Sequence, residues 1–446
     1  MSEQTPLDRV KNWSQNSITL KAITIGILIL VMLIPLSSIE SLIRERKYRN
    51  SDVREEIQSK WGRSQNIQGI ILTIPYKKYT VSKDKDGVET TTEYKTYAHF
   101  LPEEINLDAH IQTETRYRSI YDILLFSSSV DLNGFFNDVN LSDLGIKPED
   151  VLWDEAFINL GIKELASIHE EVKINVNGKE HLFQTGIKKN PNLSSGLHCN
   201  IPLNPDKPAL RFDMHLQFNA SENLAFSPLA KTTNVTAKGE WPHVSFDGAF
   251  IPIEKNISDL GFEASWKILH INRPIPASFT DEQNNINQFD FQVGLIEAVD
   301  QYQSNTRAVK YGALVISLVF ISFLFVQMIY KVRIHPVQYL LVGFSICIFF
   351  VLLLAFSEHL NFQYSYVFSA LATIIINSLY FKSIFNQKKT TIFYTLFQFI
   401  IYGFIFILVN LEEYSLIVGA LGLFIIISML MFGTKNFKWY AAPQTT

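Results

Sequence analysis

The sequence predicts an α + β membrane protein with an N-terminal transmembrane anchor, a large and mostly antiparallel β domain outside the cytoplasm, and a C-terminal bundle of five transmembrane helices. Three observations predict this fold class. Long uncharged stretches occur once near the N-terminus and five times in the last third of the chain. Lys and Arg occur in alternate connections between the last five stretches. The region between the two sets alternates apolar and polar residues with the period of a β-strand.

The uncharged stretches are each long enough to cross a bilayer. A helix that rises 1.5 Å per residue needs about 20 residues to cover roughly 30 Å of hydrocarbon. The stretches are Ala22–Ile39, Tyr311–Tyr330, Pro336–Ser357, Asn361–Phe381, Thr390–Leu411 and Tyr414–Thr434. They predict six transmembrane helices.

The basic residues of the connections predict the orientation of these helices. Lys331 and Arg333 form one basic connection, Lys382, Lys388 and Lys389 form another, and Lys435 and Lys438 follow the last helix. Because basic connections are retained in the cytoplasm, both termini are predicted to be cytoplasmic. The predicted divisions are a cytoplasmic N-terminus (1–21), a first transmembrane helix (22–43), an external β-rich domain (44–306), transmembrane helices two to six (307–434) and a cytoplasmic tail (435–446).

One signal near the first uncharged stretch disagrees with the predicted orientation, and the stretch has one alternative interpretation. Arg44, Arg46, Lys47 and Arg49 follow it on the predicted outer side, but large domains are translocated largely regardless of charge. The alternative is a cleaved signal peptide. No A-x-A pattern follows the apolar run, so we expect a retained anchor.

The external region alternates apolar and polar residues in several places, as half-buried strands do. The clearest runs are Leu210–Asn219 and Ile105–Gln112. Asn177-Gly178 and the segment Lys83–Gly87 have the composition of hairpin turns. Helices are expected only at the edges, over Ser41–Trp61 and Phe289–Tyr302. These signals predict a sandwich-like β domain.

Composition excludes some classes of function. The formal net charge is −4, which does not favour a nucleic-acid surface. Cys199 lies in the external region and Cys347 in a predicted span, so no intrachain disulfide is expected and packing must stabilise the domain.

No pattern of catalytic or metal-ligating residues stands out. Eight histidines fall in the external region but are widely spaced, which favours solvated surface positions over a metal site. They are His99, His110, His169, His181, His198, His215, His243 and His270. G-x-S-x-G and phosphate-binding loop motifs do not occur in the sequence. We therefore expect no cofactor, no metal and no enzymatic activity.

The predicted spans contain amides but no ionisable residue at mid-span. Gln327, Gln338, Asn377, Gln398 and Asn410 are expected to form hydrogen bonds between helices rather than a transport path. Glu358 and His359 lie at a predicted outer end of a span. They are the candidate membrane-edge functional pair that a transporter would use.

Several blocks of aromatic and polar residues resemble the CreD family of inner-membrane proteins, in the order of that family and from about residue 17 to Tyr440. The blocks are Trp61-Gly62-Arg63-Ser64-Gln65 with Gly69 and Pro75-Tyr76; Arg116-Tyr117-Arg118; Trp241-Pro242-His243; Asp300-Gln301-Tyr302-Gln303 with Arg307; His335-Pro336-Val337-Gln338-Tyr339; Ser357-Glu358-His359; and Leu411-Glu412-Glu413-Tyr414. The chain departs at Ile70, where the family commonly has proline, and resembles the terminal segment only loosely over Lys435–Trp439.

This resemblance implies a protein of cell-envelope integrity in the inner membrane of Gram-negative bacteria, with its large domain in the periplasm. It also implies a link to a two-component regulatory system and to tolerance of colicins and β-lactams. We hypothesise a non-enzymatic envelope-stress protein whose β domain binds a periplasmic envelope component. Two alternatives stay open: a transporter or flippase-like protein that uses the helix bundle, and a periplasmic hydrolase that acts on wall or lipid.

The block residues are interpreted as architectural. Tryptophan and arginine commonly close a domain by stacking and by bidentate hydrogen bonds, which favours this role for Trp61, Arg116, Arg118, Trp241 and His243. A ligand cleft built from the same residues is the alternative. The expected partners are the lipid bilayer and an envelope component, with no nucleic acid, and the oligomeric state is left open.

Overall fold

The computed structural model describes residues 18–83, 89–137, 139, 141–205, 209–280, 286–296, 300–330, 334–385, 387–411 and 414–434. The chain divides into two compact units. The helical unit comprises Met1–Ser51 and Val299–Thr446, and the β unit comprises Asp52–Ala298. The predicted turn Lys83–Gly87 lies mostly outside the described residues, as do the predicted orientation signals at Lys331, Arg333, Lys435 and Lys438.

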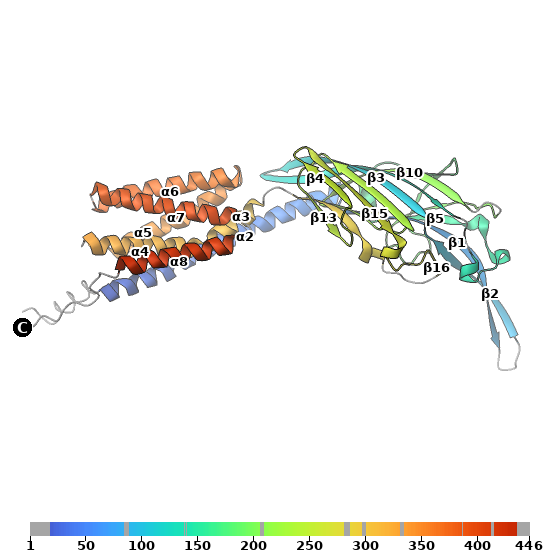
Figure 1. Ribbon diagram of the computed structural model, residues 1–446, viewed down its shortest axis with the longest axis horizontal. Helices are drawn as coiled ribbons and strands as arrows, with labels where there is room; N and C mark the ends of the chain where they lie inside the picture. Colours follow the sequence, from blue (N-terminus) through green and yellow to red (C-terminus); the bar gives the residue numbers. More distant parts are fainter. Residues whose placement is uncertain are drawn as a thin grey trace, which may run out of the picture. The chain divides into compact units, whose positions relative to one another are not determined.

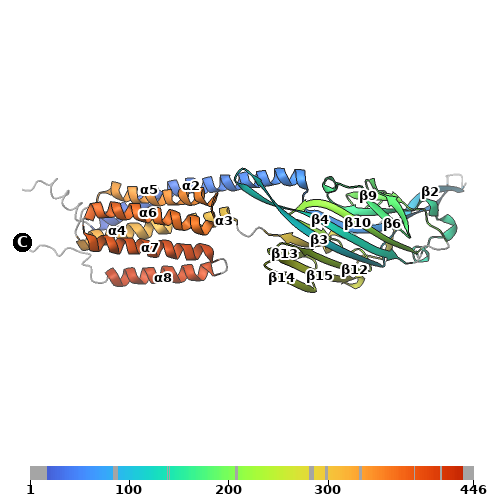
Figure 2. The same ribbon diagram turned by 90° about the horizontal axis from the view of Figure 1, so that it is seen from above.

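The helical unit contains the apolar stretches of the sequence. Its helices are α2 (Ile18–Trp61, whose last turns belong to the β unit), α3 (Gln301–Lys310), α4 (Gly312–Tyr330), α5 (Pro336–Ser357), α6 (Phe362–Phe385), α7 (Lys388–Asn410) and α8 (Ser415–Thr434). Helices α5, α6 and α7 lie side by side in both views (Figures 1 and 2). The ring of Phe349 in α5 lies between them, with its centroid 5.3 Å from that of Tyr366 in α6 and 4.9 Å from that of Tyr402 in α7.

Some of the apolar helices have the length and hydropathy of membrane spans. Among the described residues, α2, α5, α6 and α7 are long and apolar enough to cross a membrane. Helices α3 and α4 make a fifth candidate if they are counted as one span with a bend of 40°. The described apolar part of α8, Ser415–Ser428, is shorter. The prediction of helices in the five C-terminal stretches is confirmed, and the count of six spans stays a prediction.

Helix α2 joins two predicted segments without interruption. It runs for 44 residues and includes both the apolar stretch and the predicted edge helix that ends at Trp61. The other predicted edge helix, Phe289–Tyr302, is wrong. Phe291–Leu295 forms strand β17, because Phe291 and Val293 alternate with polar or small residues and are fully buried. Helix α3 begins only at Gln301, where the Asp300 side chain caps it.

The β unit contains two sheets. The nine-stranded sheet contains β1 (Gln65–Lys83), β2 (Glu89–Phe100), β5 (Phe157–Ile162), β8 (Gln184–Thr185), β9 (Gly196–Asn200), β11 (Asn223–Phe226), β13 (Val244–Gly248), β16 (Ser278–Phe279) and β17. Its order is β13-β17-β11-β1-β5-β9-β8, with β2 pairing β1 and β16. Short 3₁₀ helices, η1–η6, lie in the connections at Ser142–Leu144, Pro148–Asp150, Trp153–Glu155, Leu165–Ser167, His270–Asn272 and Ile286–Phe289.

The eight-stranded sheet contains β3 (Glu104–Arg118), β4 (Tyr121–Phe136), β6 (Lys173–Val176), β7 (Lys179–Leu182), β10 (Leu210–Ser221), β12 (Thr232–Gly239), β14 (Glu254–Ser258) and β15 (Gly261–Leu269). Its order is β14-β15-β12-β3-β4-β10-β6-β7. Most strand pairs are antiparallel, as predicted, but β1 runs parallel to β11 and β12 runs parallel to β3.

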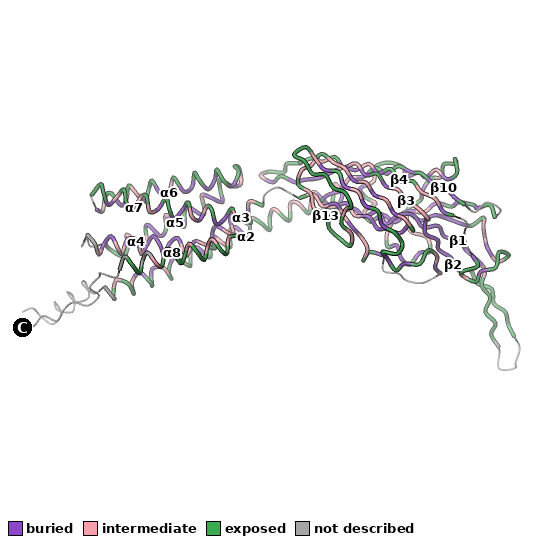
Figure 3. The backbone as a smooth tube through the Cα atoms, in the orientation of Figure 1, coloured by how far each residue is buried: buried purple, intermediate pink, exposed green. Residues whose placement is uncertain are grey.

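The two sheets share one hydrophobic core. Apolar side chains of β1, such as Ile70 and Leu72, belong to the same buried cluster as Phe212 of β10 and Val130 of β4. Buried positions recur along these strands (Figure 3). The predicted alternation of Leu210–Asn219 is confirmed, since buried and exposed residues alternate along most of β10. The predicted hairpin at Asn177-Gly178 is also confirmed, because both residues have positive φ and join β6 to β7.

Candidate functional site

Within the β unit, the last turns of α2 are held against β3 and β4 through an aromatic ring and two arginines of β3. The Trp61 indole donates a hydrogen bond to the Phe126 carbonyl (3.2 Å), and the Arg116 guanidinium lies 3.9 Å from the Trp61 ring centroid. Arg118 pairs with Glu56 of α2 at 2.8 Å. Hydrogen bonds from Lys60, the larger cause, and from Arg118 lower the pKa of the Glu56 carboxyl. The contacts connect segments far apart in the sequence.

Gly62 and Gln65 continue this attachment into the core. The Gly62 carbonyl accepts a hydrogen bond from the Ser221 hydroxyl (2.9 Å), and a Cβ at Gly62 would collide with the backbone of Asn219. The buried Gln65 amide bridges the backbone of Glu164 in both directions, each at 2.9 Å. Tyr117 between the two arginines is instead 74% exposed.

Trp241, Pro242 and His243 lie beside the end of β17. The Trp241 indole donates to the Ile296 carbonyl (3.0 Å), and the Ile296 amide donates to the His243 carbonyl (2.9 Å). The two rings meet edge to face with centroids 6.1 Å apart. These contacts fix the chain where it leaves the β unit.

Two block residues at the start of α5 form a helix cap. The His335 ring nitrogen Nδ1 accepts from the Val337 amide (3.3 Å), and the Gln338 side chain accepts from the His335 amide (2.9 Å). Pro336 occupies the first turn, where its missing N–H costs no hydrogen bond. The geometry is that of a helix start.

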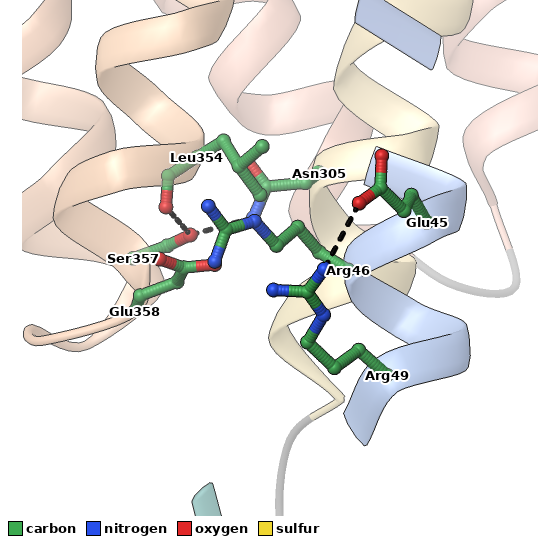
Figure 4. A network of polar contacts seen from close by, with 7 residues as sticks. All are labelled: Glu45, Arg46, Arg49, Asn305, Leu354, Ser357 and Glu358. Atoms are coloured by element: carbon green, nitrogen blue, oxygen red, sulfur yellow. Dashed lines mark hydrogen bonds and ion pairs between the residues drawn. The ribbon is translucent and has the colours of Figure 1, made fainter. Parts of the chain in front are cut away.

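A polar network joins α2, α3 and α5 in the helical unit (Figure 4). The Asn305 amide of α3 donates to the Gln301 carbonyl (2.8 Å) and to the Ser357 hydroxyl of α5 (2.7 Å). Arg46 of α2 pairs with Glu358 at 3.7 Å, and the Glu358 side chain is only 12% exposed. Sequence reasoning missed Asn305 and Arg46, because their partners lie at unrelated positions in the chain.

The structure does not combine Glu358 and His359 into one site. The His359 side chain is exposed and makes no hydrogen bond among the described residues, whereas Glu358 faces Arg46.

At the start of α3, Tyr302 is buried, and the Asp300 carboxylate accepts from the Gln303 amide (3.0 Å) and pairs with the Lys47 ammonium (3.3 Å).

The mid-span amides have mixed roles. Gln327 accepts from the Tyr339 hydroxyl of α5 (3.1 Å), and Asn377 accepts from the Ser345 hydroxyl of α5 (2.6 Å), so these two confirm the predicted bonds between helices. The other three have partners within or next to their own helices, and the prediction is wrong for them: Gln338 with His335, Gln398 with Tyr394, and Asn410 with Phe406.

The histidines do not assemble a metal site in the described part of the chain, where no group of three or more His, Cys, Asp or Glu is placed to hold an ion. His215 is exposed and lies 2.7 Å from an Asp131 oxygen. His99 differs from the predicted surface position. It is fully buried, with Nδ1 3.0 Å from the Thr73 hydroxyl, because it lies on the inner strand β2 beside Phe279.

An apolar shelf projects at one end of the eight-stranded sheet. Strand β14 is the last strand in the sheet order, and all its residues are exposed. Ile257 lies opposite the buried Phe262 of β15, so it is on the core face of the sheet and yet 46% exposed. Ile253 lies directly before β14, where its amide donates to the Ser265 carbonyl of β15 (2.8 Å), and it is 68% exposed. We call Ile251, Ile253 and Ile257 the β14 shelf.

The sequence does not indicate that the isoleucines of the β14 shelf are exposed. Ile251 and Ile253 flank Pro252, and three polar residues separate Ile253 from Ile257, so the segment lacks a regular alternation and does not show whether an apolar face is covered. Coverage depends on where the opposite sheet ends, and no short pattern reports that.

Comparison with known proteins shows similarity over nearly the whole chain. A family model described as "Inner membrane protein CreD" matches residues 17–440. The inner membrane protein CreD of Escherichia coli (strain K12) is 29% identical over 420 residues, which cover 93% of this chain and 92% of that protein.

Proposed function

Because the chain belongs to the CreD family of inner membrane proteins, we propose that it is a non-enzymatic protein of cell-envelope integrity whose β unit binds an envelope component in the periplasm. The alternation of basic connections supports a periplasmic placement of the β unit with both termini in the cytoplasm. The apolar helices hold the chain in the inner membrane.

The β14 shelf is the observation that carries the binding role. An edge strand presents unpaired backbone N–H and C=O groups, and an extended peptide can add to it as a further strand. Here the core face of the eight-stranded sheet is left exposed at β14, so Ile253 and Ile257 present apolar side chains beside that edge. The occupant that fits both features is an extended segment of an envelope protein, which pairs with β14 and covers the shelf.

The block residues support a scaffold rather than an active centre. The Trp61 and Gln65 side chains donate to backbone carbonyls, and the Gly62 carbonyl accepts from the Ser221 hydroxyl. The His335 ring nitrogen accepts from the Val337 amide in a helix cap. Such contacts position the chain and leave no nucleophile and base together. The same reasoning argues against a hydrolase built from these residues.

The contacts of Glu358 argue against the transporter alternative. A transporter of this kind would use Glu358 with His359 at the membrane edge. Glu358, directly after α5, instead pairs with Arg46 of α2. An ion pair between α2 and the end of α5 contributes to helix packing, which fits a scaffold.

The test places a photo-crosslinking amino acid in the full chain at Ile253, and at Tyr117 as a control of similar exposure on β3. Ile253 should crosslink to an envelope protein in intact cells, and Tyr117 should not. Ile257→Asp should abolish the crosslink and the rescue of a deletion strain under envelope stress, while Tyr117→Asp should preserve both. Full rescue by Ile257→Asp at normal abundance, with no crosslink at Ile253, would overturn the proposal.

A further inference from the structure

A cavity of about 330 Å³ lies between two helices of the helical unit. Its lining residues are Glu40, Arg44 and Lys47 from α2 and Gln303, Thr306, Arg307 and Lys310 from α3. On each helix they follow spacings of three and four residues, which places them on one face. Each helix therefore turns a single polar face toward the cavity.

The lining is strongly cationic. In the described part of the chain, the lining contains the cations Arg44, Lys47, Arg307 and Lys310 and the carboxylate Glu40. Glu40 pairs with Arg44 at 3.2 Å, and Lys47 pairs with Asp300 at 3.3 Å on the rim. Among the described residues that line the cavity, four are cationic and one is a carboxylate, and Asp300 adds a second carboxylate on the rim. Like charges held this close repel one another, so an anion in the cavity would relieve them.

The cavity lies at the boundary between membrane and water. The apolar stretch of α2 ends at Ile39, directly before the lining residue Glu40, and the apolar helix α4 begins at Gly312, directly after α3. Both lining faces are thus the first polar turns beyond predicted hydrocarbon. This position depends on the helices and not on which side of the membrane the β unit occupies.

Neighbouring contacts hold the two faces in place. Asn305 of α3 is bonded to Ser357 of α5, and Asp300 at the start of α3 is bonded to Lys47 of α2. Arg46 of α2 in turn faces Glu358 after α5. The helices that supply the cations are therefore fixed to a common partner, so the cavity is formed before any ligand enters.

We propose that this cavity binds a phosphate group, presented by an anionic phospholipid headgroup or by a free phosphate. Arginine forks match phosphate oxygens with two parallel hydrogen bonds, and lysine adds a point charge. The Gln303 amide and the Thr306 hydroxyl lie in the same lining and can complete the polar contacts. The volume is near the lower end of the range for small-molecule pockets, roughly 300 to 1,000 Å³, and suits one headgroup.

The chain contains a matched control for this proposal. Arg49 lies on α2, is exposed, and pairs with Glu45 four residues earlier at 3.2 Å, as Arg44 pairs with Glu40. It is not among the cavity-lining residues. Arg44→Gln and Arg49→Gln thus remove the same charge and the same kind of ion pair, but only the first alters the cavity.

The test uses the full chain purified in dodecylmaltoside and native mass spectrometry with dioleoylphosphatidylglycerol, with dioleoylphosphatidylcholine as the neutral lipid. Arg44→Gln should weaken phosphatidylglycerol binding about fivefold, and Arg44→Gln with Lys310→Gln should weaken it about thirtyfold. Arg49→Gln should leave the affinity unchanged. Arg44→Lys with Lys310→Arg keeps the charges and should retain binding, which separates loss of the site from loss of folding.

Inorganic phosphate distinguishes the two sources of the ligand. If excess phosphate fails to displace phosphatidylglycerol, the site takes a lipid headgroup. If phosphate displaces it at comparable concentration, with the same dependence on Arg44 and Lys310, the site takes free phosphate. Equal binding of phosphatidylglycerol by the unaltered chain, Arg44→Gln and Arg49→Gln overturns the proposal, as does equal weakening by the two single substitutions.

Discussion

The guanidinium of Arg116 stacks on the indole of Trp61 at 3.9 Å and also donates to the Glu114 carboxylate at 2.9 Å. Trp61 is the last residue of α2, and Arg116 lies near the end of β3. One arginine thus connects the end of a helix to a strand of the eight-stranded sheet.

Replacing Arg116 by Ala should lower the free energy of unfolding of the β unit by about 0.5–1 kcal/mol, the usual value of an exposed cation–π contact. Arg116→Lys should lose less because it keeps the charge above the ring. Urea denaturation followed by tryptophan fluorescence measures both. An Arg116→Ala protein with an unchanged midpoint but no envelope protection would favour a ligand cleft over the architectural role.

The proposed topology predicts where a cytoplasm-dependent reporter works. Fused after Thr446, the reporter should be active, because basic connections keep the C-terminus inside. Inserted at Gly87, within the connection between β1 and β2, it should be silent. A reporter that is active at Gly87 would reverse the assignment.

The β unit alone, expressed from Asn50 to Gln303, should fold as a soluble β protein without added metal. The two sheets bury a common core, and in the described residues no group of ligands is placed to hold an ion. Far-ultraviolet circular dichroism should show a β-rich spectrum that is unchanged by chelator. A helix-dominated spectrum, or unfolding on chelation, contradicts this expectation.

Asp290 should make the stability of the β unit depend on pH. Burial raises the pKa of its carboxyl, although hydrogen bonds from Ser227 and Asn66 oppose that shift. A raised folded-state pKa means that the stabilising contribution is complete below the unfolded-state pKa and is lost as pH rises through the folded value. The unaltered unit should therefore gain stability relative to Asp290→Asn as pH falls from neutrality toward 4. Thermal melts across this range should diverge, and parallel curves would contradict the prediction.

Neutralising the membrane-edge pair should leave function intact. Glu358→Gln keeps side-chain volume, His359→Asn removes the imidazole ring, and the partly exposed ion pair with Arg46 contributes at most about 1 kcal/mol. The double variant should accumulate normally and rescue a deletion strain under envelope stress, as should Arg46→Gln. Loss of rescue at normal abundance would favour a transporter.

Local signals in the sequence predicted the elements better than their partners. The alternation in Leu210–Asn219 and the Asn177-Gly178 turn are properties of adjacent residues, so they could be recognised directly. The parallel pairing of Gln65 in β1 with Leu224 in β11 is set by the whole topology. Phe291–Leu295 was misassigned because a strand of five residues is too short to establish its period against a helical flank.

In the candidate site, too, residue types could be recognised from the sequence but contacts between distant residues could not. The blocks around Trp61 and Arg116 could be singled out by residue type, and the structure brings them into contact. The pairing of Arg46 with Glu358 could not be anticipated, because the two residues come from separate helices. From the sequence, Arg46 is only one of four basic residues on the predicted outer side of the first span.

The burial of Cys199 has a redox consequence for a unit proposed to lie in the oxidising periplasm. Removal from water raises the pKa of its thiol to about 12, and only the thiolate attacks a disulfide. At neutral pH the folded unit therefore presents almost no nucleophilic sulfur to disulfide-exchange enzymes. Folding itself keeps the unpaired cysteine reduced, and mixed disulfides are restricted to chains that have opened.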